Sequence, residues 1–207
     1  MTAVKLCCMR TLDHARAAVD AGAEYVGFLL APGYRRTVAP DAVREIISAL
    51  GPSSTRYVGV FVDPDPVEAL DIARYVGLDI VQLSGRETPQ VARAMGLPVI
   101  KVVHIDGEDP LAEVERYAET GAMVALDSGR TGAPGGTGEV FDWSLAVEAA
   151  RRYPVMLAGG LTPANVAAAI REVAPEVVDV SSGIETNGVK DPEKIRAFVA
   201  AAREAGT

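Results

Sequence analysis

In Leu157-Ala158-Gly159-Gly160-Leu161-Thr162, and again in Val180-Ser181-Ser182-Gly183-Ile184-Glu185, a short apolar run leads into small residues and then into a helical pattern. Backbone amides at such a turn from strand to helix suit an anion, and phosphate is the first candidate. The alternative is that glycine only permits a tight turn. Two such turns near the end of a series of strands instead favour the phosphate site that a (β/α)8 barrel forms after its seventh and eighth strands.

Apolar runs and helix-like stretches alternate along the rest of the chain. Strands are expected near residues 4–8, 24–30, 57–62, 79–83, 98–103, 123–127, 154–158 and 177–181. Helices are expected near residues 11–21, 40–49, 65–76, 88–95, 109–119, 142–152, 163–173 and 191–204. This α/β alternation predicts a single-domain TIM barrel over residues 1–207. A doubly wound open sheet is the alternative, but its glycine fingerprint would follow the first strand, which here ends in Cys7-Cys8-Met9-Arg10.

Composition narrows the class of protein. The 207 residues carry a formal net charge of -8 without a basic cluster, which argues against nucleic-acid binding. No apolar run reaches the roughly 18 residues of a membrane span, and the N-terminus lacks the pattern of a secretory signal, so we expect a cytoplasmic protein that binds no membrane. With two cysteines and two histidines, no metal site is expected. Neighbouring residues on a strand point to opposite faces, so we expect no disulfide between Cys7 and Cys8.

Two polar residues lie at the carboxyl ends of predicted strands, where barrel enzymes place their chemistry. Cys7 ends the first strand and Asp127 the sixth. A thiolate can abstract a proton, and a carboxylic acid in apolar surroundings can donate one, so the pair could move hydrogen between neighbouring carbons. The alternatives are a small buried cysteine and an aspartate that organises a loop. His14 and His104 are expected to be structural or solvated.

The ordered motifs resemble the phosphoribosylanthranilate isomerase family, which carries out an Amadori rearrangement in tryptophan biosynthesis. The resemblance spans nearly the whole chain, and its most specific part is Val180 to Glu185 continued by Gly188-Val189-Lys190-Asp191-Pro192. The other matching segments are Lys5-Leu6-Cys7, Tyr25-Val26-Gly27-Phe28, Arg35-Arg36-Thr37-Val38, Val58-Gly59-Val60-Phe61-Val62, Val81-Gln82-Leu83, Leu126-Asp127, Gly135-Gly136-Thr137-Gly138 and Phe141-Asp142-Trp143.

The resemblance implies a role for each matching residue. Cys7 would be the general base and Asp127 the general acid on N-(5′-phosphoribosyl)anthranilate, a phosphorylated sugar-amine, and no cofactor would be needed. Arg36 would pair with the anthranilate carboxylate, and Asp179 would bind a ribose hydroxyl or support the barrel. The remaining substrate-binding residues, most of them on the phosphate, would be Gly136, Thr137, Gly159, Gly160, Ser181, Ser182 and Gly183.

Two positions depart from the family pattern. Cys8 stands where the family usually has glycine, and Ser84 stands where it usually has histidine. An altered aryl group is therefore conceivable, and the alternatives to the isomerase are a paralogous isomerase or cyclase acting on a related phosphorylated amino sugar, or a catalytically silent sensor of a phosphorylated ligand. The sequence is compatible with a monomer or a homodimer.

Overall fold

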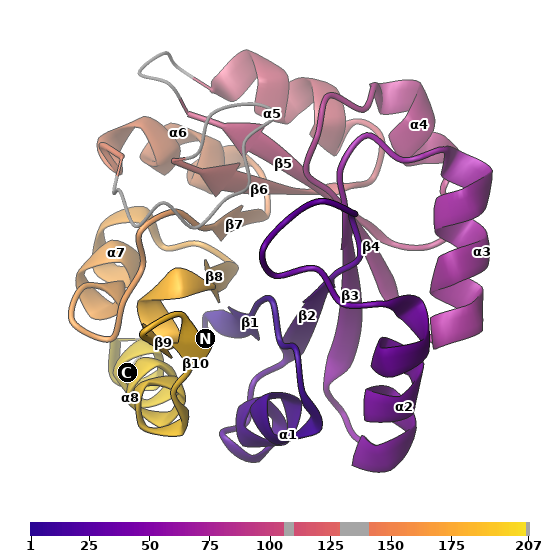
Figure 1. The fold of residues 1–207 in the computed structure, drawn as a ribbon. Coiled ribbons are helices and arrows are strands. Elements are labelled where there is room, and N and C mark those ends of the chain that lie inside the picture. The colour runs from indigo at the N-terminus through magenta and orange to yellow at the C-terminus, as the bar shows by residue number, and fades with distance from the viewer. Residues whose placement is uncertain (106–109, 129–140, 206–207) are drawn as a thin grey trace.

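Eight parallel strands form a closed barrel in chain order (Figure 1). The structure is a computed structural model and describes residues 1–105, 110–128 and 141–205. The strands of the barrel are β1 (Ala3–Leu6), β2 (Tyr25–Leu29), β3 (Arg56–Phe61), β4 (Ile80–Leu83), β5 (Val99–His104), β6 (Met123–Asp127), β7 (Val155–Leu157) and β8 (Val177–Val180).

The first and last strands close the barrel. Lys5 on β1 is in register with Tyr25 on β2 and with Asp179 on β8. The predicted (β/α)8 barrel is therefore confirmed, and the open doubly wound sheet is wrong because β1 has a neighbour on both sides.

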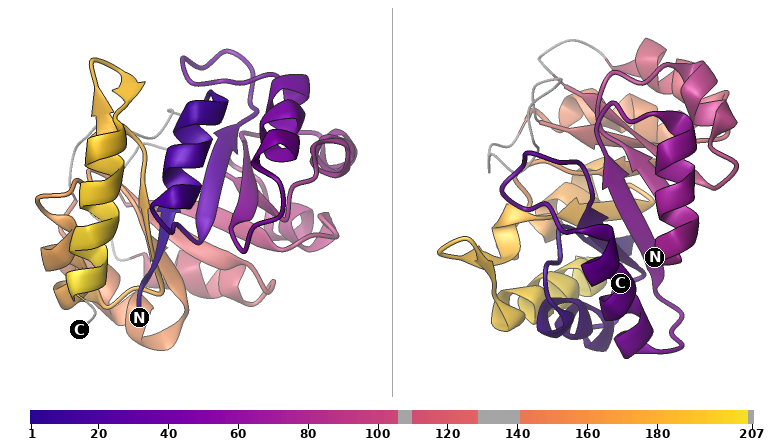
Figure 2. Two further views of the ribbon diagram at one scale, coloured as in Figure 1. Left: turned by 90° about the horizontal axis from the view of Figure 1, so that it is seen from below. Right: turned by 45° about the vertical axis from the view of Figure 1, so that its right-hand side comes forward.

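Helices surround the barrel on its outside (Figure 2). Four of them begin with proline at the first helical turn, where the missing N–H costs nothing. The last helix packs against both α1 and α7, so it completes the outer ring. The helices are α1 (Leu12–Asp20), α2 (Pro40–Leu50), α3 (Pro66–Val76), α4 (Pro89–Ala94), α5 (Leu111–Ala118), α6 (Ser144–Arg152), α7 (Val166–Val173) and α8 (Pro192–Ala205). No helix in these described ranges is long and apolar enough to cross a membrane.

The interior of the barrel changes character along the strands. Away from the carboxyl ends of the strands, the interior is an apolar cluster that is separate from the larger core between strands and helices. The buried members of this cluster are Val58, Ile80, Ile100, Val102, Ala125, Met156 and Val177. Toward the carboxyl ends of the strands, polar side chains take over the interior positions. The apolar part stabilises the barrel by burial, and the polar part is where a ligand can bind.

Helix α7 begins at Val166, later than the expected start near residue 163. The residues just before it already turn, because the Val166 amide donates to the Thr162 carbonyl at 3.1 Å. The Asn165 side chain fixes this entry to the helix: its Oδ1 accepts a hydrogen bond from the Thr162 amide at 2.7 Å and its Nδ2 donates to the Gly160 carbonyl at 3.0 Å. These bonds tie the first glycine turn to the start of α7.

The second glycine turn leads into structure that the expected elements did not include. A 3-10 helix, η1 (Ser182–Ile184), is followed by a hairpin of β9 (Glu185–Thr186) and β10 (Val189–Lys190). Asn187 and Gly188 connect the two strands with φ of 52° and 77°, which is the backbone of a type I′ turn. The hairpin places Glu185 opposite Lys190.

Candidate active site

A cavity of about 360 Å³ lies at the carboxyl ends of the barrel strands. Its walls include residues from the ends of all eight strands and from the loops that follow them. Of the expected site residues, the structure brings together here Cys7, Arg36, Asp127, Gly159, Gly160, Asp179, Ser181 and Ser182. Gly183 does not line the cavity, and Gly136 and Thr137 lie outside the described residues.

Cys7 is held at the floor of this cavity. Its amide donates to the Val180 carbonyl at 2.8 Å, just beyond the end of β1. On the neighbouring strand, Gly27 makes room for the thiol, because a Cβ there would lie 2.9 Å from the Cys7 Sγ. The base expected from the sequence is therefore buried and packed, yet it faces the cavity.

Beneath Cys7 lies a buried ion pair between the first and last strands. The Lys5 Nζ is 3.0 Å from the Asp179 Oδ2, and the Lys5 side chain is fully buried. Burial alone would lower the pKa of Lys5, but the Asp179 carboxylate raises it above its ordinary value. Lys5 also interacts with the Cys7 sulfur, so it supplies a permanent positive charge next to the thiol.

Cys8 also lines the cavity, contrary to the expectation that adjacent cysteines face opposite sides. That expectation fails because β1 ends at Leu6 and Cys8 adopts φ of 61°, in the left-handed region. The two sulfurs lie 3.7 Å apart, and both cysteines are free. A hydrogen bond with Cys7 lowers the pKa of Cys8 to about 6, and the same bond, together with burial, raises the pKa of Cys7.

Arg36 is bound to a carboxylate of the chain itself. Its Nε donates to the Glu185 Oε1 at 2.8 Å and its Nη2 to the Oε2 at 2.9 Å, which is a bidentate pair. The Lys190 Nζ lies 3.2 Å from the same carboxylate. Burial alone would raise the pKa of Glu185, but the hydrogen bonds of Arg36 and the charge of Lys190 lower it to about 2. Glu185 is therefore ionised and fixes the orientation of Arg36.

The two glycine turns pack against each other. A Cβ on Gly183 would collide with the Leu161 carbonyl oxygen, so only glycine allows this approach. Gly159 and Gly160 both have positive φ, at 85° and 63°. Lys190 braces the second turn by donating to the Ser181 carbonyl at 2.8 Å. Together the turns form one surface on the β7 and β8 side of the cavity.

The opposite side of the cavity is formed by the ends of β4, β5 and β6. His104 is in register with Asp127, and both line the cavity. Neither ring nitrogen of His104 has a hydrogen-bond partner among the described residues, although both nitrogens are buried. Gln82 donates to the Ser84 hydroxyl at 3.2 Å. This side therefore presents an imidazole from β5 and the Ser84 hydroxyl from the end of β4.

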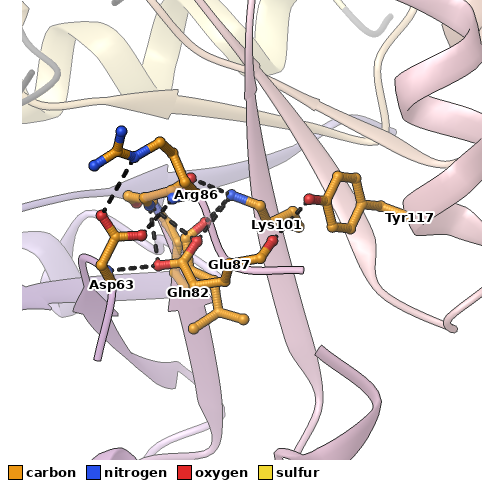
Figure 3. A network of polar contacts seen from close by, with 9 residues as sticks. Asp63, Gln82, Arg86, Glu87, Lys101 and Tyr117 are labelled. Atoms are coloured by element: carbon orange, nitrogen blue, oxygen red, sulfur yellow. Dashed lines mark hydrogen bonds and ion pairs between the residues drawn. The ribbon is translucent and has the colours of Figure 1, made fainter. Parts of the chain in front are cut away.

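A second buried ion pair holds the loop that follows β4 (Figure 3). The Lys101 Nζ is 3.0 Å from the Glu87 Oε2, and it also donates to the Gly85 carbonyl at 2.7 Å. The Glu87 carboxylate accepts from the Gly85 and Asp63 amides. Tyr117 donates its hydroxyl proton to the Glu87 carbonyl at 2.7 Å. The network lies outside the cavity, and it fixes the loop that carries Ser84.

Sequence reasoning missed the charged residues that support the site. They are Lys5, Glu87, Lys101, Glu185 and Lys190. A lysine within an apolar strand, as in Val99-Ile100-Lys101-Val102, indicates a buried cation that needs a partner. The Asn187-Gly188 pair is a strong hairpin signal that could have revealed the placement of Lys190. In the described part of the chain, no group of three His, Cys, Asp or Glu side chains is arranged to hold a metal ion.

A closed (β/α)8 barrel with ionisable side chains in a cavity at the carboxyl ends of its strands has the architecture of the barrel enzymes. Comparisons with known proteins identify the family of barrel enzymes to which the chain belongs. The family model "N-(5'phosphoribosyl)anthranilate (PRA) isomerase" matches residues 4–201. The N-(5'-phosphoribosyl)anthranilate isomerase of Desulforudis audaxviator is 50% identical over 206 residues, covering 99% of this chain and 100% of that protein. The isomerase of Roseiflexus sp. is 48% identical over 216 residues and covers 99% of each chain.

Solved structures agree with the sequence relatives. The phosphoribosyl anthranilate isomerase of Thermotoga maritima superposes with a TM-score of 0.90 at 38% identity, covering 99% of this chain and 100% of that one. A phosphoribosyl anthranilate isomerase in complex with reduced 1-(o-carboxyphenylamino)-1-deoxyribulose 5-phosphate gives a TM-score of 0.87 at 36% identity, with the same coverage. The chain therefore belongs to the phosphoribosylanthranilate isomerase family. Its activity is the isomerisation of phosphoribosylanthranilate in tryptophan biosynthesis, and the family resemblance seen in the sequence is confirmed.

Proposed function

We propose that Cys7 is the general base and Asp127 the general acid of this isomerisation. The observation that supports these roles is that a thiol from the end of β1 and a carboxyl group from the end of β6 line one cavity, together with the two glycine turns. Proton transfer of this kind needs an acid and a base on the two sides of the substrate.

The chemistry follows from moving two protons. Asp127 gives its proton to the ribose ring oxygen, the bond from this oxygen to C1′ breaks, and an open-chain Schiff base forms. The Cys7 thiolate takes the proton from C2′, and the electron pair of that C–H bond forms the C1′–C2′ double bond of an enolamine. The enolamine becomes the ketone when C1′ gains a proton and the C2′ hydroxyl loses one. The electrons stay within the substrate, so the reaction requires no cofactor.

The glycine turns would hold the phosphate. We place it on the backbone amides of Gly159, Gly160, Ser182 and Gly183, near Ser181, with Gly136 and Thr137 as further contacts that lie outside the described residues. The mutual packing of the two turns supports this placement, because Gly159, Gly160 and Ser182 line the same cavity and backbone amides at such turns suit an anion. The ligand in the related crystal structure carries both a 5-phosphate and a carboxyphenyl group, so its two ends need two anion sites.

The second anion site would be Arg36. Glu185 occupies the Nε and Nη2 edge of its guanidinium, and we assign the Nη1 edge to the anthranilate carboxylate. Asp179 uses its Oδ2 for Lys5, and its buried Oδ1 has no partner among the described residues. We assign this oxygen to a ribose hydroxyl.

The test is turnover of freshly generated phosphoribosylanthranilate, followed by the loss of its anthranilate-type fluorescence. Cys7→Ser and Asp127→Asn are each expected to lower kcat by about 10²–10⁴-fold, the usual contribution of a general acid or base. Circular dichroism and binding of a reduced product analogue control for the fold and for an intact pocket. Parent-like turnover in Cys7→Ser would overturn the assignment of the base.

We further propose that residues 1–207 act as one domain, as a monomer or homodimer in the cytoplasm. The continuous barrel from β1 to β8 supports the single domain. The biosynthetic role in small-molecule metabolism supports the location. Light scattering coupled to size-exclusion chromatography distinguishes the two assembly states.

A further inference from the structure

Cys8 occupies a backbone position that suits glycine. Its φ of 61° lies in the left-handed region, which residues with a Cβ rarely adopt outside turns. A strained non-glycine residue at a functional site is a reason to look for a function of its side chain. Here the side chain is a second ionisable thiol, 9% exposed, which lines the same cavity as Cys7.

The two sulfurs are close enough to share a hydrogen. The Sγ to Sγ distance of 3.7 Å is that of a hydrogen bond between thiols in which either sulfur can be the donor. A thiolate accepting from a neighbouring thiol is more stable than an isolated buried thiolate, because the hydrogen bond replaces part of its lost hydration.

The charged groups around the pair favour one thiolate. Three cations face it: Lys5 from β1, Arg36 from the loop after β2, and Lys190 from β10. Two carboxylates pair with these cations, Asp179 on β8 and Glu185 on β9. Three cations and two carboxylates leave one positive charge, which a single thiolate neutralises.

Of the other ionisable groups that line the cavity, Tyr34 packs against the cluster that contains the two cysteines, and the rest lie farther along the wall or at the rim. Asp127 and His104 lie at the ends of β6 and β5, on strands not adjacent to β1. Arg35 is largely exposed at the rim, where its pairing with Glu185 at 3.3 Å is screened by water. The Ser181 hydroxyl also interacts with the Cys8 sulfur. The two sulfurs pack in an apolar cluster with Leu29, Ala31 and Val60, and the nearby charges that favour a thiolate come from Lys5 and Lys190.

We propose that Cys7 and Cys8 form a thiol pair that shares one proton, and that Cys8 is a positioning residue: it carries the negative charge of the resting pair, and transfer of the shared proton from the Cys7 sulfur to the Cys8 sulfur makes Cys7 the base. This inference rests on the proposed role of Cys7. When the Cys7 thiolate takes the C2′ proton, an S–H bond forms as the C–H bond breaks, and both sulfurs then carry a proton. One of these protons leaves before the next turnover, which restores the shared state.

The decisive measurement is the ultraviolet absorbance of thiolate as a function of pH, made without substrate. The parent is expected to ionise in two separate steps that belong to the pair. Cys8→Ala and Cys7→Ala each leave one thiol without its partner, so each is expected to ionise at least one pH unit above the first step of the parent. If either single variant ionises at the same pH as the first step of the parent, the proposal is overturned, because the low ionisation pH would then belong to one cysteine alone.

Activity provides the second readout. The acid limb of kcat/KM reports the ionisation of the free enzyme, so in Cys8→Ala it should move to higher pH, and kcat/KM on that limb should fall about tenfold for each pH unit that the limb moves. Cys8→Ser, which keeps a hydroxyl donor, should move the limb back toward the parent. An acid limb at the same pH in the parent and in Cys8→Ala would also overturn the proposal.

The backbone at Cys8 calls for a control variant. Cys8→Gly removes the thiol and also relieves the left-handed strain, so it gives the same titration test if Cys8→Ala does not fold. The titration does not depend on the substrate. A parent protein that shows the shared ionisation but does not turn over phosphoribosylanthranilate would disprove the proposed function and leave the thiol pair standing.

Discussion

At the scale of single residues, the site depends on where a side chain is missing as much as on where one is present. Gly27 on β2 leaves the space that the Cys7 thiol fills, and Gly183 leaves the space for the Leu161 carbonyl. Cys8 does the opposite, because it adds a side chain where the backbone favours none. The positions of the reacting groups are therefore set by contacts with neighbouring strands.

Gly27→Ala tests this dependence. The new Cβ would lie 2.9 Å from the Cys7 Sγ and 3.3 Å from its Cα, so the thiol must move. We expect kcat to fall at least tenfold, since a displacement of about 1 Å in a reacting group can cost 10²-fold. The KM should change little, because the glycine turns are on other strands. Steady-state kinetics checks both values.

Gly59→Ala is the matched control on the adjacent strand. Its new Cβ would meet the side chains of Leu78, Phe61 and Leu30, and none of these three residues has been assigned a part in the chemistry. Thermal unfolding should show that this variant loses stability while its kcat stays near that of the parent. Equal losses of kcat in the two glycine variants would contradict a specific effect on Cys7.

At the scale of elements, buried charges fix the loops that follow the strands. The pair of Lys101 and Glu87 in Figure 3 joins β5 to the loop after β4, and both side chains are nearly completely buried. The hairpin of β9 and β10 does the same for the second glycine turn through Lys190. In both cases a lysine reaches from a strand to the carbonyl groups of a loop.

Lys101→Met is expected to destabilise the protein strongly. It would leave the Glu87 carboxylate buried without its cation, and breaking a buried pair in this way typically costs about 3–5 kcal/mol. Urea unfolding measures the change in the free energy of unfolding. Arg152→Met breaks the exposed pair with Glu148 on α6 and serves as the comparison, with an expected cost of less than about 1 kcal/mol. Similar costs for the two variants would show that Glu87 is solvated.

The sequence predicted the elements better than it predicted their ends. The helices expected near residues 65–76 and 191–204 appear as α3 and α8, each beginning at a proline that follows an aspartate, because start signals of this kind are a local property of the chain. The link between the first glycine turn and the start of α7 depends on Asn165 bonding back to Gly160, which propensity alone does not reveal. The strand alternation predicted opposite faces for Cys7 and Cys8 and was wrong, because both residues lie beyond the end of β1 and Cys8 has a left-handed backbone.

The supporting charges were harder to predict for a different reason. Lys5 and Asp179 are 174 residues apart in the sequence, and only barrel closure brings them together. The same holds for Arg36 and Glu185. Motifs can indicate the reacting residues one at a time, whereas the partners of a buried charge depend on the fold of the whole chain.

At the scale of the whole molecule, the charges around the cavity make stability depend on pH. The pKa of Glu185 falls from the ordinary 4.5 to about 2, so folding is favoured when this group is ionised. The contribution is fully present above pH 4.5 and is lost as the pH falls toward 2. Because the Glu185 carboxylate binds both Arg36 and Lys190, its protonation weakens the contacts between the loop after β2 and the hairpin of β9 and β10.

Glu185→Gln should show this linkage directly. At pH 7 the variant is expected to be about 3 kcal/mol less stable than the parent, since it leaves buried cations without their carboxylate. The difference should shrink as the pH is lowered from 4.5 toward 2, because the parent then loses the same charge. Urea midpoints at pH 7 and pH 3 check both statements. A difference that stays constant with pH would mean that Glu185 does not carry its charge in the folded state.

Barrel closure through the register of Lys5 with Asp179 also has a consequence for biosynthesis of the chain. Synthesis runs from the N-terminus, so Cys7 and Cys8 are made before β8, whose Val180 carbonyl accepts a hydrogen bond from the Cys7 amide. Until β8 pairs with β1, the two free thiols lack part of the barrel that buries them. During that interval the nascent polypeptide is open to oxidants and alkylating agents at both sulfurs, before the ring of strands shields them.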